Sequence, residues 1–308
     1  MTQKGFRHLH PILFGLLILT GIFLLICGGI SLLVNSASRH DRREIFGQKD
    51  GVGVIDLQGV IVSPEETLQD LLEFRRNDKV KAIVLRIDSP GGAVGASQEI
   101  FQEVLRTNRS KPVVASMGSV AASGGYYAAL GAERILANPG TITGSIGVIV
   151  KFANLEELFG KIGYRSEVIK SGKLKDLGSP SRPLSEEERA LLQGLIDNVH
   201  AQFIQSVAEN RHLPAEQVRA LADGRVFSGE QAEQAGLIDA LGNFTDAAIL
   251  AAELGGLKPE AEMPWLIYPE KEEFPFIPEF LRGSGSDALL GRVFQQIPGL
   301  CYEWALAQ

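Results

Sequence analysis

Two glycine-rich turns, each directly after an uninterrupted apolar run, constrain the fold of this chain most. The run "KAIVLRI" (81–87) precedes "DSPGGAVG" (88–95), and "PVVASM" (112–117) precedes "GSVAASGGYYAAL" (118–130). Apolar runs without alternation are typical of strands that are buried on both faces of a parallel sheet. A segment with helical spacing follows each turn, so strands alternate with helices. This order predicts an α/β fold with a parallel sheet and right-handed crossovers.

Other segments supply the remaining elements of such a fold. Strands are predicted at 51–62, 134–137, 146–150 and 165–169. Helices are predicted at 64–77, 96–108 and 184–211, and short helices and turns at 224–257. The long helix begins with Ser185 and Glu188, a capping-box pair that satisfies two backbone N–H groups. Together these segments predict one α/β domain over residues 51–257.

An uncharged stretch near the N-terminus predicts a membrane anchor. Residues 11–34 carry no charged side chain and, at about 1.5 Å per residue, reach roughly 36 Å as a helix, enough to cross a bilayer. Cleaved signal peptides have shorter apolar cores of roughly 7–15 residues, although small residues at 34–36 leave cleavage open. We expect one transmembrane helix, with a cytoplasmic stub at 1–10 and a polar linker at 35–50. The flanking basic residues would keep the C-terminal part in the cytoplasm, but large domains cross membranes largely regardless of such charges.

The composition argues against several other function classes. The formal net charge of −7 disfavours a nucleic-acid-binding surface, which needs clustered basic residues. The two cysteines, Cys27 and Cys301, form no disulfide framework, and no pattern of cysteine and histidine has the spacing of metal ligands. We therefore expect no nucleic-acid partner and no metal site.

Residues 258–308 differ in composition from the preceding domain. Pro, aromatic and acidic residues are frequent in 264–287, and 288–308 is apolar again. We expect this segment to be a C-terminal tail. It can cover its own domain, pack on a neighbouring subunit or lie at a membrane surface, and the sequence leaves these three possibilities open.

The two glycine-rich turns also place groups suited to acyl transfer near each other. The carboxyl ends of parallel strands converge at one edge of a sheet, where the active sites of α/β proteins form. The amides of Gly92 and Gly124 could form an oxyanion hole there, because glycine lets backbone N–H groups face a cleft. Ser123 lies beside them at the start of a predicted helix, whose positive end favours a developing negative charge. Glycine turns more often serve packing alone, so this interpretation needs further support.

A serine nucleophile needs a general base, and the sequence offers two kinds. His200 and His212 lie on the long helix or at its end, and His200 is more simply a residue of the helix face. Lys170, Lys173 and Lys175 cluster before the long helix, in a stretch that is otherwise typical of a solvated basic loop. Spacing alone does not choose among the three lysines.

A lysine acts as a base only when its amine is neutral. Lowering a lysine pKa from about 10.4 to about 7 requires roughly 4–5 kcal/mol of desolvation or repulsion between like charges. Burial under a covering segment supplies such an effect, and a neighbouring hydroxyl would hold the neutral amine in place. Ser119 and Ser145 are the candidates for that hydroxyl.

Five motifs follow one another along the chain: "DSPGG", "GSVAASGGYYAA", "TGSIGVI", "KSGKLKDLGSPSRPLSEEER" and "GRVFSGEQAEQAGLID". Together they resemble the signal peptide peptidase A family of Ser-Lys peptidases in its short bacterial form. The resemblance covers about residues 51–255, and the N-terminal anchor also fits it. It implies a ClpP/crotonase-like α/β fold, with repeated ββα units, behind one transmembrane helix.

The resemblance assigns roles to individual residues. Ser123 in "AASGGYY" matches the nucleophile, Lys175 in "LKDLGSP" the general base and Ser145 in "TGSIG" the hydroxyl that orients the lysine. The oxyanion-hole amides match Gly124 and the turn of Gly91 and Gly92, in which we prefer Gly92.

An activity, a location and partners follow from the same resemblance. The family hydrolyses remnant signal peptides and other unstructured hydrophobic peptides at the membrane, and it uses no metal or cofactor. Its members assemble as homo-oligomeric rings or domes with the catalytic grooves inside. We therefore expect a single-pass serine endopeptidase of the bacterial cytoplasmic membrane, with its catalytic domain on the extracytoplasmic side.

Three alternatives remain at this point. A crotonase-type acyl-CoA enzyme would use similar glycine turns, but it has no evident use for Ser123, Lys175 or the anchor. A membrane-anchored scaffold that has kept the fold would not need Ser123. A different Ser-Lys membrane protease, one that cleaves membrane-associated partner proteins, would share the whole site and differ in its substrate.

Overall fold

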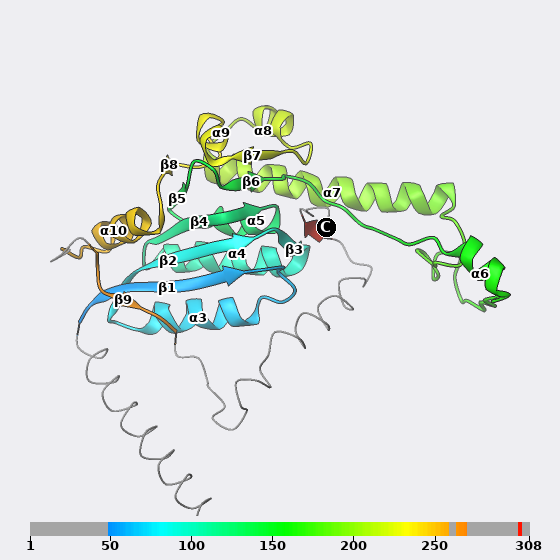
Figure 1. The fold of residues 1–308 in the computed structure, drawn as a ribbon, viewed down its shortest axis with the longest axis horizontal. Helices are drawn as coiled ribbons and strands as arrows, with labels where there is room; N and C mark the ends of the chain where they lie inside the picture. Colours follow the sequence, from blue (N-terminus) through cyan, green and yellow to red (C-terminus); the bar gives the residue numbers. More distant parts are fainter. Residues whose placement is uncertain (1–48, 259–262, 270–300, 304–308) are drawn as a thin grey trace, which may run out of the picture. The chain divides into compact units, whose positions relative to one another are not determined.

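The computed structural model describes residues 49–258, 263–269 and 301–303 (Figure 1). The predicted anchor at 11–34, most of the linker and most of the C-terminal tail lie outside the described residues. None of the helices in the described part of the chain is long and apolar enough to cross a membrane.

A largely parallel sheet forms the centre of the described fold (Figure 1). Its long strands are β1 (Gly51–Gln58), β2 (Val80–Ser89) and β4 (Val113–Ala122), and β2 lies between the other two. The other strands of this eight-stranded sheet are β5 (Arg134–Ala137), β6 (Ile142–Gly144), β7 (Val226–Ser228), β8 (Ala240–Leu241) and β9 (Leu266–Ile267). Within it only β6 and β7 pair antiparallel. The predicted α/β class with a mainly parallel sheet is therefore confirmed.

Helices cover both faces of the sheet. The helices of the described residues are α3 (Glu65–Arg76), α4 (Val94–Asn108), α5 (Gly124–Ala129), α6 (Glu156–Ile162), α7 (Glu186–Arg211), α8 (Ala215–Leu221), α9 (Gly229–Gln234) and α10 (Phe244–Leu254), of which α6 lies away from the sheet (Figure 1). The larger apolar core lies between one face of the sheet and helices that include α3, α4, α5 and α7, and the smaller core lies between the other face and α10.

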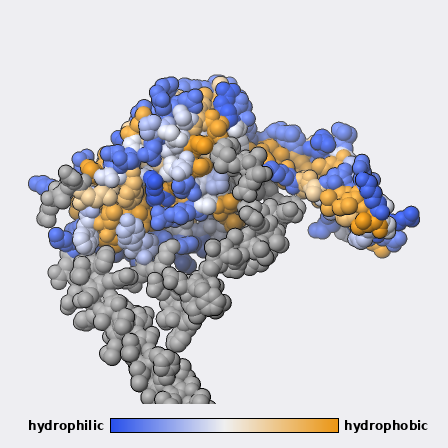
Figure 2. Space-filling view, viewed as in Figure 1, coloured by the Kyte–Doolittle hydropathy of each residue, from blue (hydrophilic) through white to orange (hydrophobic). Residues whose placement is uncertain are grey.

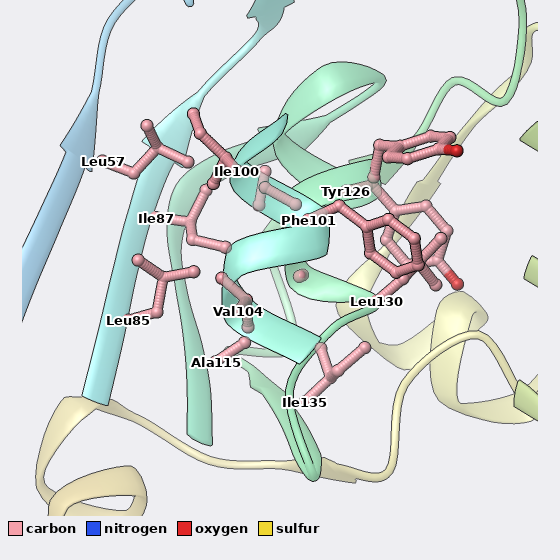
Figure 3. Close-up of a cluster of buried hydrophobic side chains, with 14 of the residues drawn as sticks. Leu57, Leu85, Ile87, Ile100, Phe101, Val104, Ala115, Tyr126, Leu130 and Ile135 are labelled. Atoms are coloured by element: carbon pink, nitrogen blue, oxygen red, sulfur yellow. The ribbon is translucent and has the colours of Figure 1, made fainter. Parts of the chain in front are cut away.

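The strand β2 shows why its middle residues, 82–85, are all apolar. Leu85 and Ile87 belong to the larger core, while Val84 belongs to the smaller one, so successive residues of the strand are buried on opposite faces. Figure 3 shows Ile100 and Val104 of α4 packing over Leu85 and Ile87. Burying one such aliphatic side chain contributes about 1.5–3 kcal/mol, and a strand buried on both faces gains this at every position.

The long helix α7 packs on the core along only part of its length. Ser185 caps its N-terminus and forms the predicted capping box with Glu188. Phe203 and Val207 in its C-terminal half are fully buried, but Leu191 in its N-terminal half is 52% exposed. The predicted helix is confirmed, and the apolar core residues of α7 all lie in its C-terminal half.

Two of the predicted short strands are wrong. The segment 146–150 contains no strand, because the sheet strand there is β6, which ends earlier, at Gly144. Positive φ angles of 80° at Gly144 and 51° at Ser145 then turn the chain away from β4. The segment 165–169 pairs with no strand of the described residues, and it is exposed. Apolar, β-branched residues favour a strand only where a partner strand is available.

Two described pieces of the tail pair with strands of the same chain. β9 runs parallel to β1 at the edge of the sheet, where the Val52 N–H donates to Trp265 O at 2.8 Å. The strand β10 (Cys301–Glu303) pairs antiparallel with β3 (Gly91–Ala93), the short strand formed by the first glycine-rich turn. The end of the chain therefore reaches the turn that carries Gly91 and Gly92.

Candidate active site

Ser123 lies at the junction between β4 and α5 in an unusual backbone conformation. Its φ of 53° and ψ of −115° are rare for any residue other than glycine. The residue is 1% exposed, and its Oγ has no hydrogen-bond partner among the described residues. Its N–H donates to Gly144 O at 2.8 Å, and its carbonyl accepts from Tyr127 N at 2.8 Å. Hydrogen bonds thus fix both the N–H and the carbonyl group of Ser123, while its hydroxyl bonds to no described residue.

Small residues follow Ser123 because other chain segments approach closely. A Cβ on Gly124 would collide with Ser97 Oγ, and a Cβ on Gly125 would lie 2.8 Å from Ser89 O. The same added atom on Gly124 would lie 3.2 Å from Gly92 N. The two glycine-rich turns, predicted to converge from separate strands, therefore do meet beside Ser123.

The Gly91 and Gly92 turn is fixed from one side by Ile61. Ile61 N–H donates to Gly91 O at 2.8 Å, and Ala93 N–H donates to Ile61 O at 2.7 Å. Because successive residues of a strand point their N–H and C=O groups to opposite sides, the polar groups of Gly92 face away from Ile61. A Cβ on Gly92 would collide with Ile61 O, so no larger residue fits at this position. The amide of Gly92 thus faces the edge opposite Ile61, along which β10 pairs with β3 and Tyr302 lies opposite Gly92.

Ser145 lies next to Ser123 through the pairing of β4 with β6. Ala122 pairs with Gly144, and a serine with positive φ follows each of these residues. Ser145 is 6% exposed, and its N–H donates to Arg225 O at 2.8 Å. Ser119, the other candidate hydroxyl, is exposed and lies within β4, four residues before Ser123 in the sequence. Of the two, the structure brings Ser145 to the nucleophile candidate.

The three candidate lysines lie on an exposed segment, and two of them are occupied by ion pairs. Lys170 pairs with Asp176, and Lys173 pairs with Glu187. No ion pair of Lys175 is found among the described residues, and its side chain is exposed. No residue between 151 and 187 is buried. Since Ser123 Oγ has no hydrogen-bond partner among the described residues, which include Lys175, the lysine does not reach it within one chain.

An ion-pair network attaches the lysine segment to the start of α7. Arg182 donates two hydrogen bonds to the Glu188 carboxylate, at 2.8 and 2.6 Å, and it lies 3.0 Å from Asp176 Oδ1. Hydrogen bonds from Arg182, and then from Lys170, lower the pKa of Asp176 from 3.8 to about 2. Arg182 likewise holds the pKa of Glu188 well below its ordinary value. Lys175, next to Asp176 in sequence, is therefore carried on an ordered segment.

Neither candidate histidine approaches Ser123. His200 lies on α7, and its Nε2 is buried without a partner among the described residues. His212 ends α7 in a left-handed conformation with φ 55°. No group of three His, Cys, Asp or Glu side chains in the described part of the chain is arranged to hold a metal ion.

Two family models match the chain. The model of Peptidase family S49 matches residues 106–258, and the model of Clp protease matches residues 60–141. The first range includes Ser123 and Lys175, and the second includes both glycine-rich turns. The predicted relation to a ClpP-like fold is confirmed by the second match.

Several curated proteins are similar to this chain. A Synechocystis protein, provisionally named protease slr0021, is 46% identical over 207 residues, which make up 67% of this chain and 75% of that protein. The chloroplastic serine protease SPPA of Arabidopsis thaliana is 35% identical over 240 residues, covering 77% of this chain and 35% of that protein. An Enterococcus faecium protein, provisionally named signal peptide peptidase SppA, is 38% identical over 181 residues, covering 58% of this chain and 53% of that protein. The chain thus spans about a third to a half of the length of the last two relatives. Its motifs, its fold and these matches agree that the chain belongs to peptidase family S49.

Proposed function

We propose that this peptidase is a membrane-anchored serine endopeptidase that uses Ser123 as nucleophile and Lys175 as general base. The observation that carries the proposal is Ser123 itself. Its Oγ has no structural partner among the described residues, its backbone is held at φ 53°, and the Gly92 and Gly124 backbones lie beside it. A buried polar group without a partner is costly, so its retention at a strained junction favours a catalytic role.

The proposed reaction is acyl transfer through an ester intermediate. The neutral amine of Lys175 takes the proton of Ser123 Oγ, which attacks the peptide carbonyl carbon. The N–H groups of Gly92 and Gly124 stabilise the oxyanion, and the Lys175 ammonium gives its proton to the leaving amine. Water, deprotonated by Lys175, then attacks the ester and releases Ser123. Ser145 orients the lysine amine in both steps.

The position of Lys175 supports a second element of the proposal, a homo-oligomer. The exposed segment that carries it and the adjoining N-terminal half of α7 also expose large apolar side chains: Leu158, Ile162, Val168 and Ile169 in the segment, and Leu191 and Leu195 in α7. Figure 2 shows apolar surface gathered over this α6 end of the molecule. Such a surface is typical of a protein interface. A neighbouring copy would bury it and bring Lys175 to Ser123, in a ring or dome with its grooves inside.

The proposed substrates are extended, hydrophobic peptides, including remnant signal peptides. The edge of β3 already takes an extended backbone, since β10 pairs with it. A peptide bound there would cross the Gly91 and Gly92 turn and present a carbonyl near Ser123. The anchor proposed at 11–34 would hold the enzyme at the bacterial cytoplasmic membrane, with the domain on the extracytoplasmic side. The name of the Enterococcus faecium relative points to the same substrates.

Hydrolysis of a signal-peptide-like hydrophobic peptide by the full chain in detergent micelles tests the proposal. Ser123→Ala and Lys175→Ala should each lower kcat/KM at least about 10³-fold, while Lys173→Ala should stay within about threefold of wild type. Full activity of Ser123→Ala would rule out the assigned nucleophile. Cleavage of membrane proteins but not of peptides would favour the partner-cleaving alternative, and acyl-CoA binding without hydrolysis would favour the crotonase-type one.

Mixing the two inactive variants tests where the base comes from. Ser123→Ala supplies Lys175, and Lys175→Ala supplies Ser123, so oligomers formed from both should regain about one quarter of wild-type activity by random pairing. If mixed oligomers regain nothing although each variant assembles normally, the base does not come from a second copy.

A further inference from the structure

The strand β4 contains an irregularity directly before Ser123. Between the pairs Ile87↔Met117 and Ser89↔Ala121, β2 advances by two residues while β4 advances by four. On the side of β4 that faces away from β2, the residues before this bulge pair with β5 and the residues after it pair with β6. The bulge at Gly118–Val120 therefore moves β4 from one neighbour to the other, and it brings the strand end to Ser145.

Asp88 of β2 holds the bulge from one side. Its Oδ1 accepts from Val120 N at 3.1 Å, and its Oδ2 accepts from Ser119 N at 3.3 Å. A Cβ on Gly118 would lie 2.7 Å from Oδ2, so only glycine lets the carboxylate approach this closely. One side chain thus takes the place of the backbone carbonyls that a regular strand pair would supply.

Side chains from the other side complete the bulge. Thr141 Oγ1 donates to Gly118 O at 2.7 Å, and Asn138 Nδ2 donates to Met117 O at 3.3 Å. Ser89, the residue after Asp88, contacts the turn of Gly91 and Gly92, since its Oγ accepts a hydrogen bond from Gly91 N at 3.1 Å. Consecutive residues at the end of β2 therefore contact the strand that leads to Ser123 and the turn that leads to Gly92.

We propose that Asp88 is a positioning residue, whose carboxylate fixes the bulge of β4 and so aligns Ser123 with the Gly92 and Gly124 amides. The proposal rests on the proposed function, because it assumes that Ser123 is the nucleophile. Replacing Asp88 by alanine would leave two N–H groups of the bulge without their acceptor, and the strand end could shift. A displacement of about 1 Å of a reacting group can cost about 10²-fold in rate.

Kinetics of the full chain in detergent micelles, with a hydrophobic peptide and with an activated acyl ester, test this role. The variants are Asp88→Ala, Asp88→Asn and the control Asp56→Ala, which removes an exposed carboxylate from the neighbouring strand β1. Steady-state rates give kcat and KM, and the ester burst counts competent sites. Hydrogen exchange of the amides at 119–122 reports on the bulge independently of activity.

Asp88→Ala should lower kcat about 10²-fold, change KM less than about threefold and leave the burst amplitude at the wild-type value. Exchange at Ser119 and Val120 should become faster. Asp88→Asn, which keeps one acceptor oxygen, should recover part of kcat, and Asp56→Ala should match wild type.

The proposal is overturned if Asp88→Ala keeps wild-type kcat, or if only its burst amplitude falls, because a loss of competent sites indicates a folding role. Ser123→Ala measured in parallel separates the two proposals. If Ser123→Ala retains the burst, the proposed function fails, and the exchange at Ser119 and Val120 alone then decides whether Asp88 holds the bulge.

Discussion

Ser123 has a backbone conformation that serine rarely adopts. Such a conformation costs of order 1–3 kcal/mol and persists only where the surroundings fix it. Here the fixation comes from Gly144 O, from the first turn of α5 and from the tight contacts of Gly124 and Gly125. The small residues of "AASGG" are therefore required by close approach to neighbouring segments, and not by local flexibility.

Gly124→Ala tests this requirement. The added methyl group would collide with Ser97 Oγ and would lie 3.2 Å from Gly92 N, so the two turns must separate. We expect kcat on the peptide to fall at least about 10²-fold, because the oxyanion donors would no longer face one point. Gly95→Ala on α4 is the matched control, since a Cβ there meets no atom within 4 Å. Equal activity of the two variants would contradict the predicted geometry.

At the level of elements, ion pairs, and not an apolar core, attach the segment that carries Lys175 to α7. Arg182 joins Asp176 and Glu188, and none of the residues from 151 to 187 is buried. Hydrogen bonds to both carboxylates lower their pKa values. A segment held in this way keeps its own shape while its apolar side chains stay exposed for a partner.

The order of this segment should depend on pH in one direction. Because the pKa of Asp176 is lowered from 3.8 to about 2, its stabilising contribution is complete above its ordinary value and is lost as the pH falls from about 4 to about 2. Hydrogen-exchange protection factors at 170–182 should therefore stay constant from pH 8 to about 5 and fall below about 4. Arg182→Gln should lower them already at pH 7, whereas Arg189→Gln, an exposed change on α7, should not. Protection that is unchanged in Arg182→Gln would show that the network does not hold the segment.

At the scale of the whole molecule, the described end of the chain lies at the candidate active site. The backbone of Cys301–Glu303 pairs with β3 along the edge that the proposed peptide substrate would use. A tethered segment competes at an effective concentration that reaches the millimolar range, which exceeds many peptide concentrations. The chain's own end and a substrate therefore cannot both occupy this edge.

Tyr302→Pro tests that competition through the backbone alone. Proline removes the N–H of residue 302, which lies opposite Gly92, and it cannot join the strand ladder. We expect KM for the peptide to fall by about threefold or more while kcat stays the same, because a competitor is removed without touching the reacting groups. Tyr302→Ala, which keeps the N–H, is the control for loss of the side chain. A KM that is unchanged in Tyr302→Pro would show that β10 does not limit access.

Features that depend on residues close together along the chain could be predicted from the order of residues. The runs that became β2 and β4, the capping box of α7 and the glycine turns after the strands could all be predicted, because burial on both faces and local capping leave a direct pattern. Convergence of the two turns followed from parallel-sheet topology, and the structure brings Gly92 to Gly124 as expected. The choice of Lys175 came only from a family resemblance.

Which segments pair with one another became apparent in the folded chain. The segment 165–169 has strand-forming residues, but it pairs with no strand in the part of the chain that the structure describes. The strand β4 pairs first with β5 and then with β6 at a bulge held by Asp88, whose role no local pattern indicated. The separation of Lys175 from Ser123 within one chain is equally invisible in the sequence. Strand pairing and side-chain contact depend on groups far apart along the chain, so the order of residues predicts elements more readily than it predicts which elements meet.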